Sequence, residues 1–336
     1  MNKVTRFISD VLFDKEINLD LFPRKNNDNF WDQFVKTGSS HYVIPALYYK
    51  LKERGFLNLL NDELVSYLEE IYNQNYKRNI ELVKEVNKIS HILKTNDIDH
   101  VFLKGAALVS SIYKESIGIR MIGDIDILIS NNQLLKAKEL ITANGYKNQT
   151  KYYGLSGRHL PRLINNKKIF ALELHNLLVY KNAAVVLNHY DFIKRKTVQK
   201  VNILNWKDFL FHIILNFQIN DHGSLRANFS FRTLFDVFNI IKTKPETLDQ
   251  LDESVHVDKI KLVMSKLQVL NYKDKSNLFL FNLRLKLKSN SSLYSNLENI
   301  VINIIISINL NFNRTVEFIK IKKYRLHVLH KLGLVK

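Results

Sequence analysis

The segment Arg120-Met-Ile-Gly-Asp124-Ile-Asp126-Ile-Leu-Ile129 alternates polar and apolar residues, as a β-strand with one buried face does. Side chains two positions apart on a strand lie on the same face, so Asp124 and Asp126 project together. Two carboxylates this close repel each other unless a positive charge lies between them. Mg²⁺ takes hard oxygen ligands, typically one or two carboxylates together with substrate phosphates. The pair therefore predicts a divalent-cation site, although an isolated Asp-x-Asp is also common on exposed loops.

A turn that could hold phosphate precedes this strand. The β-rich run His100-Val-Phe-Leu103 ends at Lys104-Gly105, and a helix-like segment from Ala106 to Tyr113 follows. Glycine lets backbone N–H groups approach a phosphate, and the start of a helix favours an anion. Lys104 can meet that phosphate as a point charge, or it is an ordinary lysine at the end of a strand. Arg120 could likewise neutralise a phosphate or be a plain surface arginine.

A second predicted strand, Lys168–His175, supplies a third carboxylate. By alternation Ala171, Glu173 and His175 share one face of it. A carboxylate among apolar neighbours is costly unless its face is wet or binds a metal, and an exposed Glu is the alternative. Three acidic residues on two strands beside a glycine turn are typical of a two-metal phosphoryl-transfer site. His175 could orient metal-bound groups, and His159 could contact substrate, although a loop histidine beside a proline is often structural.

These segments resemble the bacterial "uncharacterised nucleotidyltransferase" family of the DNA-polymerase-β-like nucleotidyltransferase superfamily. The resemblance covers roughly residues 25–245 and is densest over 100–146. Superfamily members usually carry Gly-Ser or Gly-Gly at the turn, where this chain has Gly105-Ala106. The resemblance is carried by the following segments: Trp31, His41–Leu47, Val101–Leu108, Tyr113, Arg120–Ile129, Gly145-Tyr146, Arg158–Pro161, Leu172–His175, Trp206–His212 and Arg232–Asp236.

The resemblance implies a nucleotidyltransferase that moves a nucleoside monophosphate from an NTP to a hydroxyl acceptor and releases pyrophosphate. It implies Mg²⁺ or Mn²⁺ as cofactor and a two-metal mechanism. The acceptor is left open among a sugar, a small metabolite, an RNA end and a protein hydroxyl. The site then divides into catalytic and metal-binding Asp124, Asp126 and Glu173, nucleotide-binding Lys104, Gly105, Ala106 and Arg120, and substrate contacts at His159 and His175.

The pattern along the chain predicts an α+β fold, in which a small nucleotidyltransferase palm with a mixed β-sheet is flanked by helical regions. We expect a helical region over 1–96, the nucleotidyltransferase core over 97–200 and a second helical region over 201–336. Within them, apolar spacing predicts a long helix over 63–93. The polar stretch 147–166 and the Ser- and Asn-rich residues 289–295 are predicted to be loops.

Composition excludes several protein classes. The 336 residues are 46% hydrophobic with 10 Gly and 4 Pro, which is typical of a folded protein rather than a disordered one. The absence of Cys excludes disulfide scaffolds, thiolate metal sites and a Cys nucleophile. Residues 300–312, the most apolar run, are interrupted by Asn and Ser, so we expect no membrane span. No signal-peptide pattern opens the chain, and we expect a cytoplasmic protein.

The net charge of +18 leaves a second function open. A catalytically weak palm could act as a binding or scaffold module that engages nucleic acid or an anionic surface through its basic C-terminal region. We favour a compositional origin of this charge. Leu, Ile and Phe alternate with the lysines at helical spacing, which predicts an amphipathic, core-facing helix bundle after residue 256.

Overall fold

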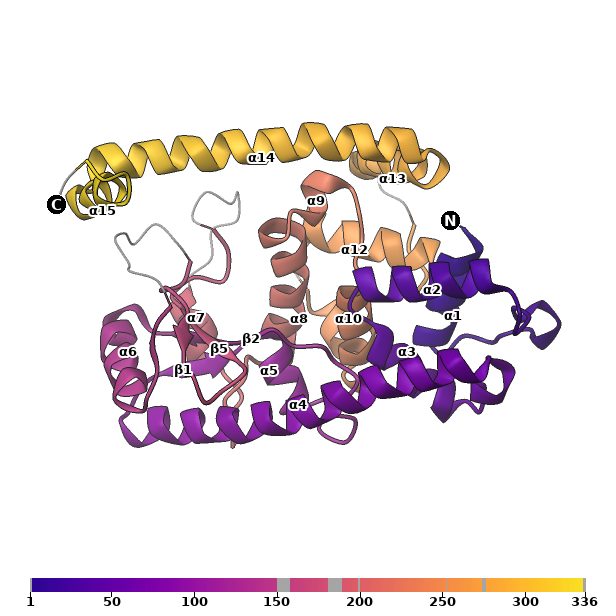
Figure 1. Cartoon of the computed structure of the whole chain (residues 1–336), viewed down its shortest axis with the longest axis horizontal. Coiled ribbons are helices and arrows are strands. Elements are labelled where there is room, and N and C mark those ends of the chain that lie inside the picture. Colours follow the sequence, from indigo (N-terminus) through magenta and orange to yellow (C-terminus); the bar gives the residue numbers. More distant parts are fainter. Residues whose placement is uncertain are drawn as a thin grey trace.

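The structure, a computed structural model, describes residues 2–149, 158–180, 189–198, 200–251, 253–273 and 276–334. It is 63% helical with one five-stranded mixed sheet, so the predicted α+β class is confirmed. Before the sheet lie α1 (Lys3–Leu12), α2 (Asp28–Ser40), α3 (Ile44–Glu53) and the long α4 (Asp62–Thr95), with 3-10 turns η1 (Leu19–Leu21) and η2 (Leu57–Leu59) between them. Figure 1 shows α4 running the length of the molecule beneath the sheet.

The sheet has the strand order β1-β2-β5-β4-β3. Its central strands, β2 (Asp124–Ile129) and β5 (Ala171–His175), are parallel, and their register places Asp126 beside Glu173. The other pairings are antiparallel. The remaining elements of this region are β1 (His100–Phe102), α5 (Lys104–Val109), η3 (Asn131–Gln133), α6 (Leu134–Ala143), β3 (Lys147–Asn148), β4 (Leu163–Ile164) and α7 (His189–Lys194).

Two details of this region differ from the sequence prediction. The predicted loop 147–166 contains the short strands β3 and β4, and residues 150–157 of it lie outside the described part. These strands carry too few residues to show an alternating pattern. The helix predicted after Lys104 ends at Val109, because the chain turns there toward the segment that leads into β2.

Buried amides of α4 hold the segment that precedes β2. Asn79 is fully buried and its Nδ2 donates to the carbonyl oxygens of Ile117 (2.7 Å) and Arg120 (2.8 Å). Asn75 Nδ2 donates to the carbonyls of Gly118 (2.6 Å) and Arg120 (3.1 Å). Since this segment has no strand partner of its own, the amides replace a ladder of backbone hydrogen bonds and fix where the aspartate strand begins.

We expect Asn79→Leu to lower the free energy of unfolding by about 2 kcal/mol, because the Ile117 carbonyl loses its amide donor and the Arg120 carbonyl keeps only Asn75. Asn73→Leu, at an exposed position of the same helix, should change it by less than about 0.5 kcal/mol. Urea unfolding measures both. Equal stability of the two variants would show that α4 does not hold this segment through Asn79.

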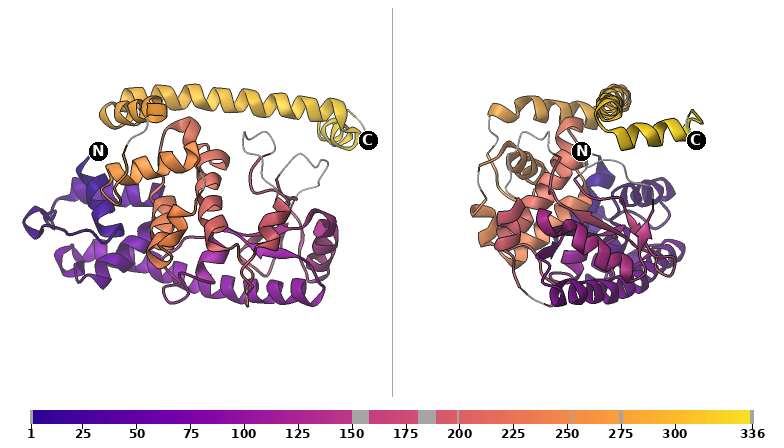
Figure 2. Two further views of the ribbon diagram at one scale, coloured as in Figure 1. Left: turned by 180° about the vertical axis from the view of Figure 1, so that it is seen from behind. Right: turned by 90° about the vertical axis from the view of Figure 1, so that its left-hand side faces the viewer.

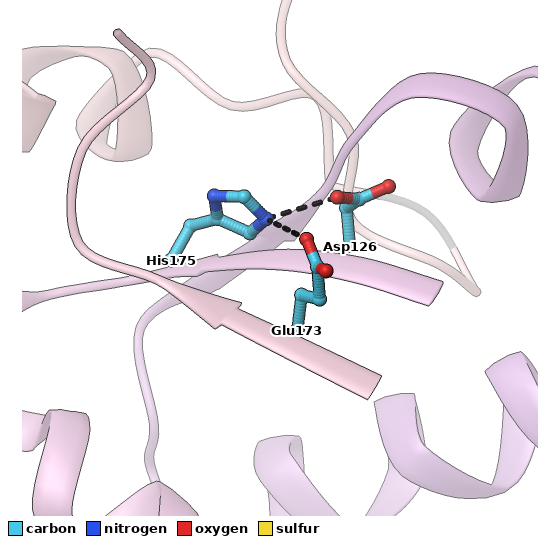
Figure 3. Close-up of side chains that lie close together, drawn as sticks. All are labelled: Asp126, Glu173 and His175. Atoms are coloured by element: carbon cyan, nitrogen blue, oxygen red, sulfur yellow. Dashed lines mark hydrogen bonds and ion pairs between the residues drawn. The ribbon is translucent and has the colours of Figure 1, made fainter. Parts of the chain in front are cut away.

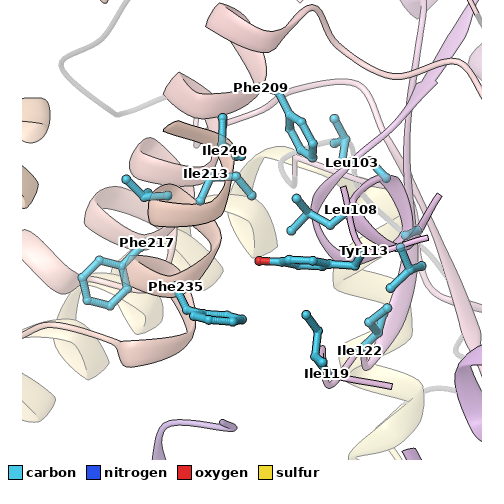
Figure 4. Packing of buried hydrophobic residues seen from close by; sticks show 14 of the residues in the cluster. Leu103, Leu108, Tyr113, Ile119, Ile122, Phe209, Ile213, Phe217, Phe235 and Ile240 are labelled. Carbon is cyan, nitrogen blue, oxygen red and sulfur yellow. The ribbon is translucent and has the colours of Figure 1, made fainter. Parts of the chain in front are cut away.

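Helices after the sheet pack against it. They are α8 (Trp206–Leu215), the π-helical segment η4 (Asn216–Asn220), α9 (Gly223–Arg226), α10 (Phe231–Thr243), α11 (Glu246–Asp249) and α12 (Val255–Lys266). Figure 4 shows Phe209, Phe235 and Ile240 of these helices facing Leu108 and Tyr113 beside the sheet. The Tyr113 hydroxyl also donates to Asp236 of α10 (3.0 Å). Residues 4 to 281 contribute to one continuous core, so the C-terminal helices form one wall of the region around β2.

His100 on β1 makes the stability of this core depend on pH. It is fully buried, and burial lowers the pKa of its imidazole to about 4. The unfolded chain protonates this group at its ordinary pKa of 6.5, whereas the folded protein does so only near pH 4. The unfolded state therefore binds more protons between those values, and stability falls as the pH falls through this window.

We expect the stability difference between the wild type and His100→Phe to shift by up to about 3 kcal/mol between pH 7 and pH 4, in favour of the variant. Urea titrations across that range measure it. The exposed His91→Phe is the control and should show a constant difference. A constant difference for His100→Phe as well would contradict burial of a neutral imidazole.

The C-terminal end departs most from prediction. The predicted loop 289–295 is helical except at Ser291, which separates α13 (Phe279–Asn290) from α14 (Ser292–Lys320) and caps α14 by accepting from the N–H of Tyr294. The predicted core-facing bundle is wrong for α14, where Ile302 is the one buried residue. Figures 1 and 2 show α14 on the opposite side of the body from α4, with α15 (Lys322–Lys331) at its far end. The 3-10 turn η5 (Ser276–Leu278) leads into this arm.

Among the described residues, one helix, α14, is long and apolar enough by length and composition to cross a bilayer. An 18-residue window of α14 has a mean hydropathy of 1.2 and is 6% buried. The helix is therefore a weak candidate for a span.

Candidate active site

The parallel pairing of β2 and β5 builds the centre of the site. Because Asp126 and Glu173 are register partners, their side chains leave the sheet on the same face, and His175 follows two residues later on that face. Figure 3 shows the three side chains converging. Each offers one ligand atom, and the three atoms lie within 4.8 Å of one another. Two buried carboxylates and an imidazole so arranged fit a divalent cation.

Asp126 is held by two donors. Its Oδ1 accepts from Lys104 Nζ (2.7 Å) and from His175 Nε2 (2.9 Å). Burial raises the pKa of the Asp126 carboxyl, but Lys104 and then His175 outweigh burial, so this pKa lies well below its ordinary value. Asp126 therefore stays ionised at any physiological pH, as a metal ligand must be.

Asp124, the other predicted ligand, has a different environment. It lies outside the close group of Asp126, Glu173 and His175, and its side chain is 22% exposed. Burial raises the pKa of its carboxyl, Arg162 partly offsets this, and the charges of Glu173 and Asp126 raise it further. The repulsion between carboxylates that the sequence predicts therefore raises the pKa of Asp124, whereas the pKa of Asp126 is lowered.

Arg162 is a site residue that the sequence interpretation missed. Its Nε donates to Glu173 Oε1 (2.8 Å) and its Nη2 to Asp124 Oδ2 (2.5 Å), so one guanidinium links both strands. Burial raises the pKa of Glu173, but His175 and Arg162 outweigh it and the pKa is lowered. Leu163 pairs with Leu172, which places Arg162 opposite Glu173 across β4 and β5. Only the position of Arg162 across the sheet from Glu173 could have indicated its role. That position cannot be inferred from the sequence without predicting the two-residue strand β4.

The predicted phosphate turn lies directly beside the carboxylates. The N–H of Leu103 donates to the carbonyl oxygen of Asp126 (2.9 Å), which fixes the turn against β2. Lys104 has a φ of 49°, in the left-handed region that non-glycine residues seldom adopt, and such strain clusters at functional sites. A Cβ at Gly105 would lie 2.7 Å from Ile122 Cγ1, so the close contact at this position requires glycine. Ala106 is buried behind it.

Arg120 lines the site but is already paired. Its Nε and Nη2 contact Asp236 of α10 at 2.8–3.0 Å, and its Nη1 donates to the Met121 carbonyl (2.6 Å). Both side chains are buried. Asp236 lies 116 residues from Arg120 along the chain, so no local spacing indicates this pair. A phosphate contact by Arg120 stays a prediction.

His159 lies next to the carboxylates. Its Nδ1 hydrogen-bonds with the Leu160 carbonyl (2.7 Å), while Nε2 lies 3.7 Å from Glu173 Oε2. The His159 and His175 rings are 5.0 Å apart. Burial lowers the pKa of His159, and Glu173 opposes that effect. The structure thus brings every predicted site residue to one region, and their individual roles stay predictions.

A cavity of about 260 Å³ joins these groups. It lies between the sheet and helices α8 and α10, and its lining is strongly charged. The lining residues are Lys104, Gly105, Arg120, Met121, Ile122, Gly123, Asp124, Asp126, Arg158, Arg162, Glu173, Ile213, Asn216, Asp221, Arg232, Thr233 and Asp236. A pocket with both basic groups and metal-binding carboxylates suits a ligand that carries phosphates.

Comparison with known proteins agrees with this geometry. No curated protein matches the chain. Residues 27–270 match the model of the family described as uncharacterised nucleotidyltransferase, which covers the sheet, the cavity and the helices that line it. Members of such a family act on nucleoside triphosphates and generally use divalent metals. The chain belongs to the uncharacterised nucleotidyltransferase family and is a nucleotidyltransferase.

Proposed function

We propose that the protein transfers a nucleoside monophosphate from an NTP to a hydroxyl acceptor and releases pyrophosphate. The observation that carries the proposal is the close group of Asp126, Glu173 and His175 in a cavity with five basic side chains. The acceptor oxygen forms a bond to the α-phosphorus as the bond from that phosphorus to the bridging oxygen breaks. The hydroxyl proton leaves to solvent, and pyrophosphate carries away the negative charge.

Asp124, Asp126 and Glu173 would hold Mg²⁺ or Mn²⁺ as two ions, with His175 beside them. Bound divalent ions polarise the phosphate and stabilise both the attacking and the leaving oxygens. Lys104 keeps Asp126 ionised, and Gly105 with Ala106 places the turn where phosphates would lie. Arg162 holds Glu173 Oε1, and His175 Nε2 lies 3.4 Å from Oε2, the oxygen that would orient the acceptor hydroxyl. We also propose that the protein acts in the cytoplasm, where NTPs are available.

Metal-dependent labelling tests the proposal. The protein is incubated with α-labelled NTPs, Mn²⁺ or Mg²⁺, and pools of sugars, metabolites, RNA or protein, and pyrophosphate release is followed. Labelling of one acceptor pool that EDTA abolishes is the expected result. Absence of pyrophosphate release from every NTP, together with no Mn²⁺ binding by calorimetry, would favour the alternative of a catalytically weak palm that serves as a binding module.

A further inference from the structure

Two arginines of the cavity lack the carboxylate partners that its other cations have. Lys104 pairs with Asp126, Arg120 with Asp236, and Arg162 with Asp124 and Glu173. Within the described ranges, Arg158 and Arg232 have no carboxylate within ion-pair distance. Asp221, on the same wall as Arg232, attracts both arginines electrostatically but lies beyond that distance.

Both arginine side chains are nevertheless half-buried. Arg158 Nε and Nη1 are buried without a hydrogen-bond partner among the described residues, and the guanidinium carbon lies 5.5 Å from the ring centre of Tyr180. The guanidinium carbon of Arg232 lies 4.9 Å from the ring centre of Tyr42. Burial lowers the pKa of Arg232, which is a sign of the same desolvation. Arginine stays charged in proteins, so its burial raises the free energy of the protein unless a bound anion offsets the desolvation.

We propose that Arg158 and Arg232 form an anion subsite that takes the phosphate chain of the NTP, on the cavity side formed by α10 and the segment before β4. This inference rests on the proposed function for the identity of the ligand. Each planar guanidinium can donate two parallel hydrogen bonds to phosphate oxygens. Lys104, already bound to Asp126, then serves the carboxylates more than the phosphates. Because only a highly charged anion compensates for the desolvation of two arginines, the subsite would select such a ligand.

Calorimetric titration of inorganic tripolyphosphate in EDTA tests the subsite without metal or catalysis. Loss of one charge-assisted contact should weaken the Kd by about tenfold or more in Arg158→Gln and in Arg232→Gln. Arg158→Lys and Arg232→Lys should retain part of the affinity, and they serve where a Gln variant does not fold. Arg195→Gln is the control, because that arginine pairs with Asp208 outside the cavity.

The outcomes separate the subsite from the reaction. Weakened tripolyphosphate binding without detectable nucleotidyl transfer would leave the subsite standing and overturn the proposed function. Unchanged binding in the Gln variants, or none by the wild type, would overturn the subsite. The binding of a non-hydrolysable NTP with Mg²⁺ to the Gln variants should weaken in parallel. If its Kd is unchanged while the Kd of a sugar phosphate is weakened, the subsite binds a phosphate of the acceptor, and the assignment to the NTP is overturned.

A second, independent observation concerns α14. Its side toward the body is mixed: Ile302 is buried there, Asn303 accepts from Arg226 (2.7 Å), and Glu298 accepts from Arg284 (2.7 Å). The opposite side carries large apolar residues at helical spacing, 49–68% exposed. They are Leu293, Leu297, Ile300, Val301, Ile304, Ile305, Ile308, Phe312 and Ile319. Ile302 packs toward the protein's own core, but the nine residues named above face away from it, and contiguous exposed apolar surface of this kind marks an interaction site.

Charge and geometry favour one occupant for this face. Residues 279–334 contain nine Lys and Arg against two Glu, so two copies packed through α14 would bring like charges together. At about 100° per residue these apolar residues span about 140° of the helix circumference, which is wide for a two-stranded coiled-coil seam. Asn, Arg314 and Glu317 on the other side favour a helix that lies in an interface over one that spans.

We infer that α14 binds the anionic surface of a lipid bilayer, with its apolar face in the headgroup region and basic groups such as Lys320 and Lys322 near the phosphates. Apolar burial and attraction to anionic lipid add in such helices. The inference does not depend on the reaction. It places the enzyme at a membrane, where an acceptor at the surface would lie within reach.

Co-sedimentation of the full chain with vesicles of phosphatidylcholine, with or without 30% phosphatidylglycerol, tests it. Binding should require the anionic lipid, weaken at least tenfold in Ile304→Glu/Ile308→Glu, and weaken about fivefold per charge in Lys320→Gln and Lys322→Gln. Asn309→Glu is the control for charge on the polar side. Failure to bind, dimerisation through the apolar face in light scattering, retention in membranes after alkaline carbonate, or tighter binding to RNA than to vesicles would each overturn the inference.

Discussion

Asp126→Asn is expected to lower nucleotidyl transfer by about 10³-fold or more, because several kcal/mol of transition-state stabilisation by a bound cation corresponds to about three powers of ten in rate. It should also lower the free energy of unfolding by about 1–3 kcal/mol. The carboxylate is the acceptor for both Lys104 and His175, and a neutral amide leaves the Lys104 ammonium without its counter-charge. Pyrophosphate release and urea unfolding measure the two effects.

Asp124→Asn should separate these effects. Burial and two neighbouring carboxylates raise the pKa of Asp124, so the fold already disfavours its charge. We therefore expect Asp124→Asn to lower nucleotidyl transfer, as Asp126→Asn does. The free energy of unfolding should stay nearly unchanged or increase slightly. Repulsion between the two carboxylates would by itself favour this outcome for both aspartates, but the contacts of Asp126 restrict it to Asp124. Asp249→Asn, at an exposed position, controls for amide substitution. Full activity of either site variant would remove it from the metal site.

The centre of the site was predictable because its pattern is local. Alternation along two strands placed Asp126, Glu173 and His175 on shared faces, and the parallel register then needed only to align the strands. The long helix α4 followed from a continuous apolar period in the same way. A pattern that repeats every two residues on a strand, or every three to four on a helix, predicts which side chains share a face. The backbone geometry within that one element determines this.

The groups that support the site were not predictable, because they come from distant parts of the chain. Arg162 meets Asp124 across 38 residues, and Asn79 meets Arg120 across 41. No local spacing encodes such pairs. For α14 the apolar period was read correctly as an amphipathic helix, but periodicity does not tell on which side the rest of the protein lies.

Arg120 and Asp236 give the largest expected effect on stability. The two side chains are 9% and 1% exposed, and they join the segment before β2 to α10 on the far side of the cavity. Removing one member of a buried pair leaves an uncompensated charge, which costs about 3–5 kcal/mol. We therefore expect losses of that size in Arg120→Met and in Asp236→Asn, measured by urea unfolding.

The double variant Arg120→Met/Asp236→Asn should be much less unstable than the sum of the two losses, because no buried charge remains and the Asn oxygen can still accept from Tyr113. Arg195→Met is the matched control, since its guanidinium pairs with Asp208 but is half-exposed, and it should cost about 1 kcal/mol at most. Additive losses in the double variant would show that the two residues act separately. The same double variant tests the predicted phosphate contact of Arg120. Once the fold is restored, a Kd for Mg²⁺-NTP that stays weakened at least tenfold would assign Arg120 to the nucleotide, whereas a wild-type Kd would confine it to holding the cavity walls together.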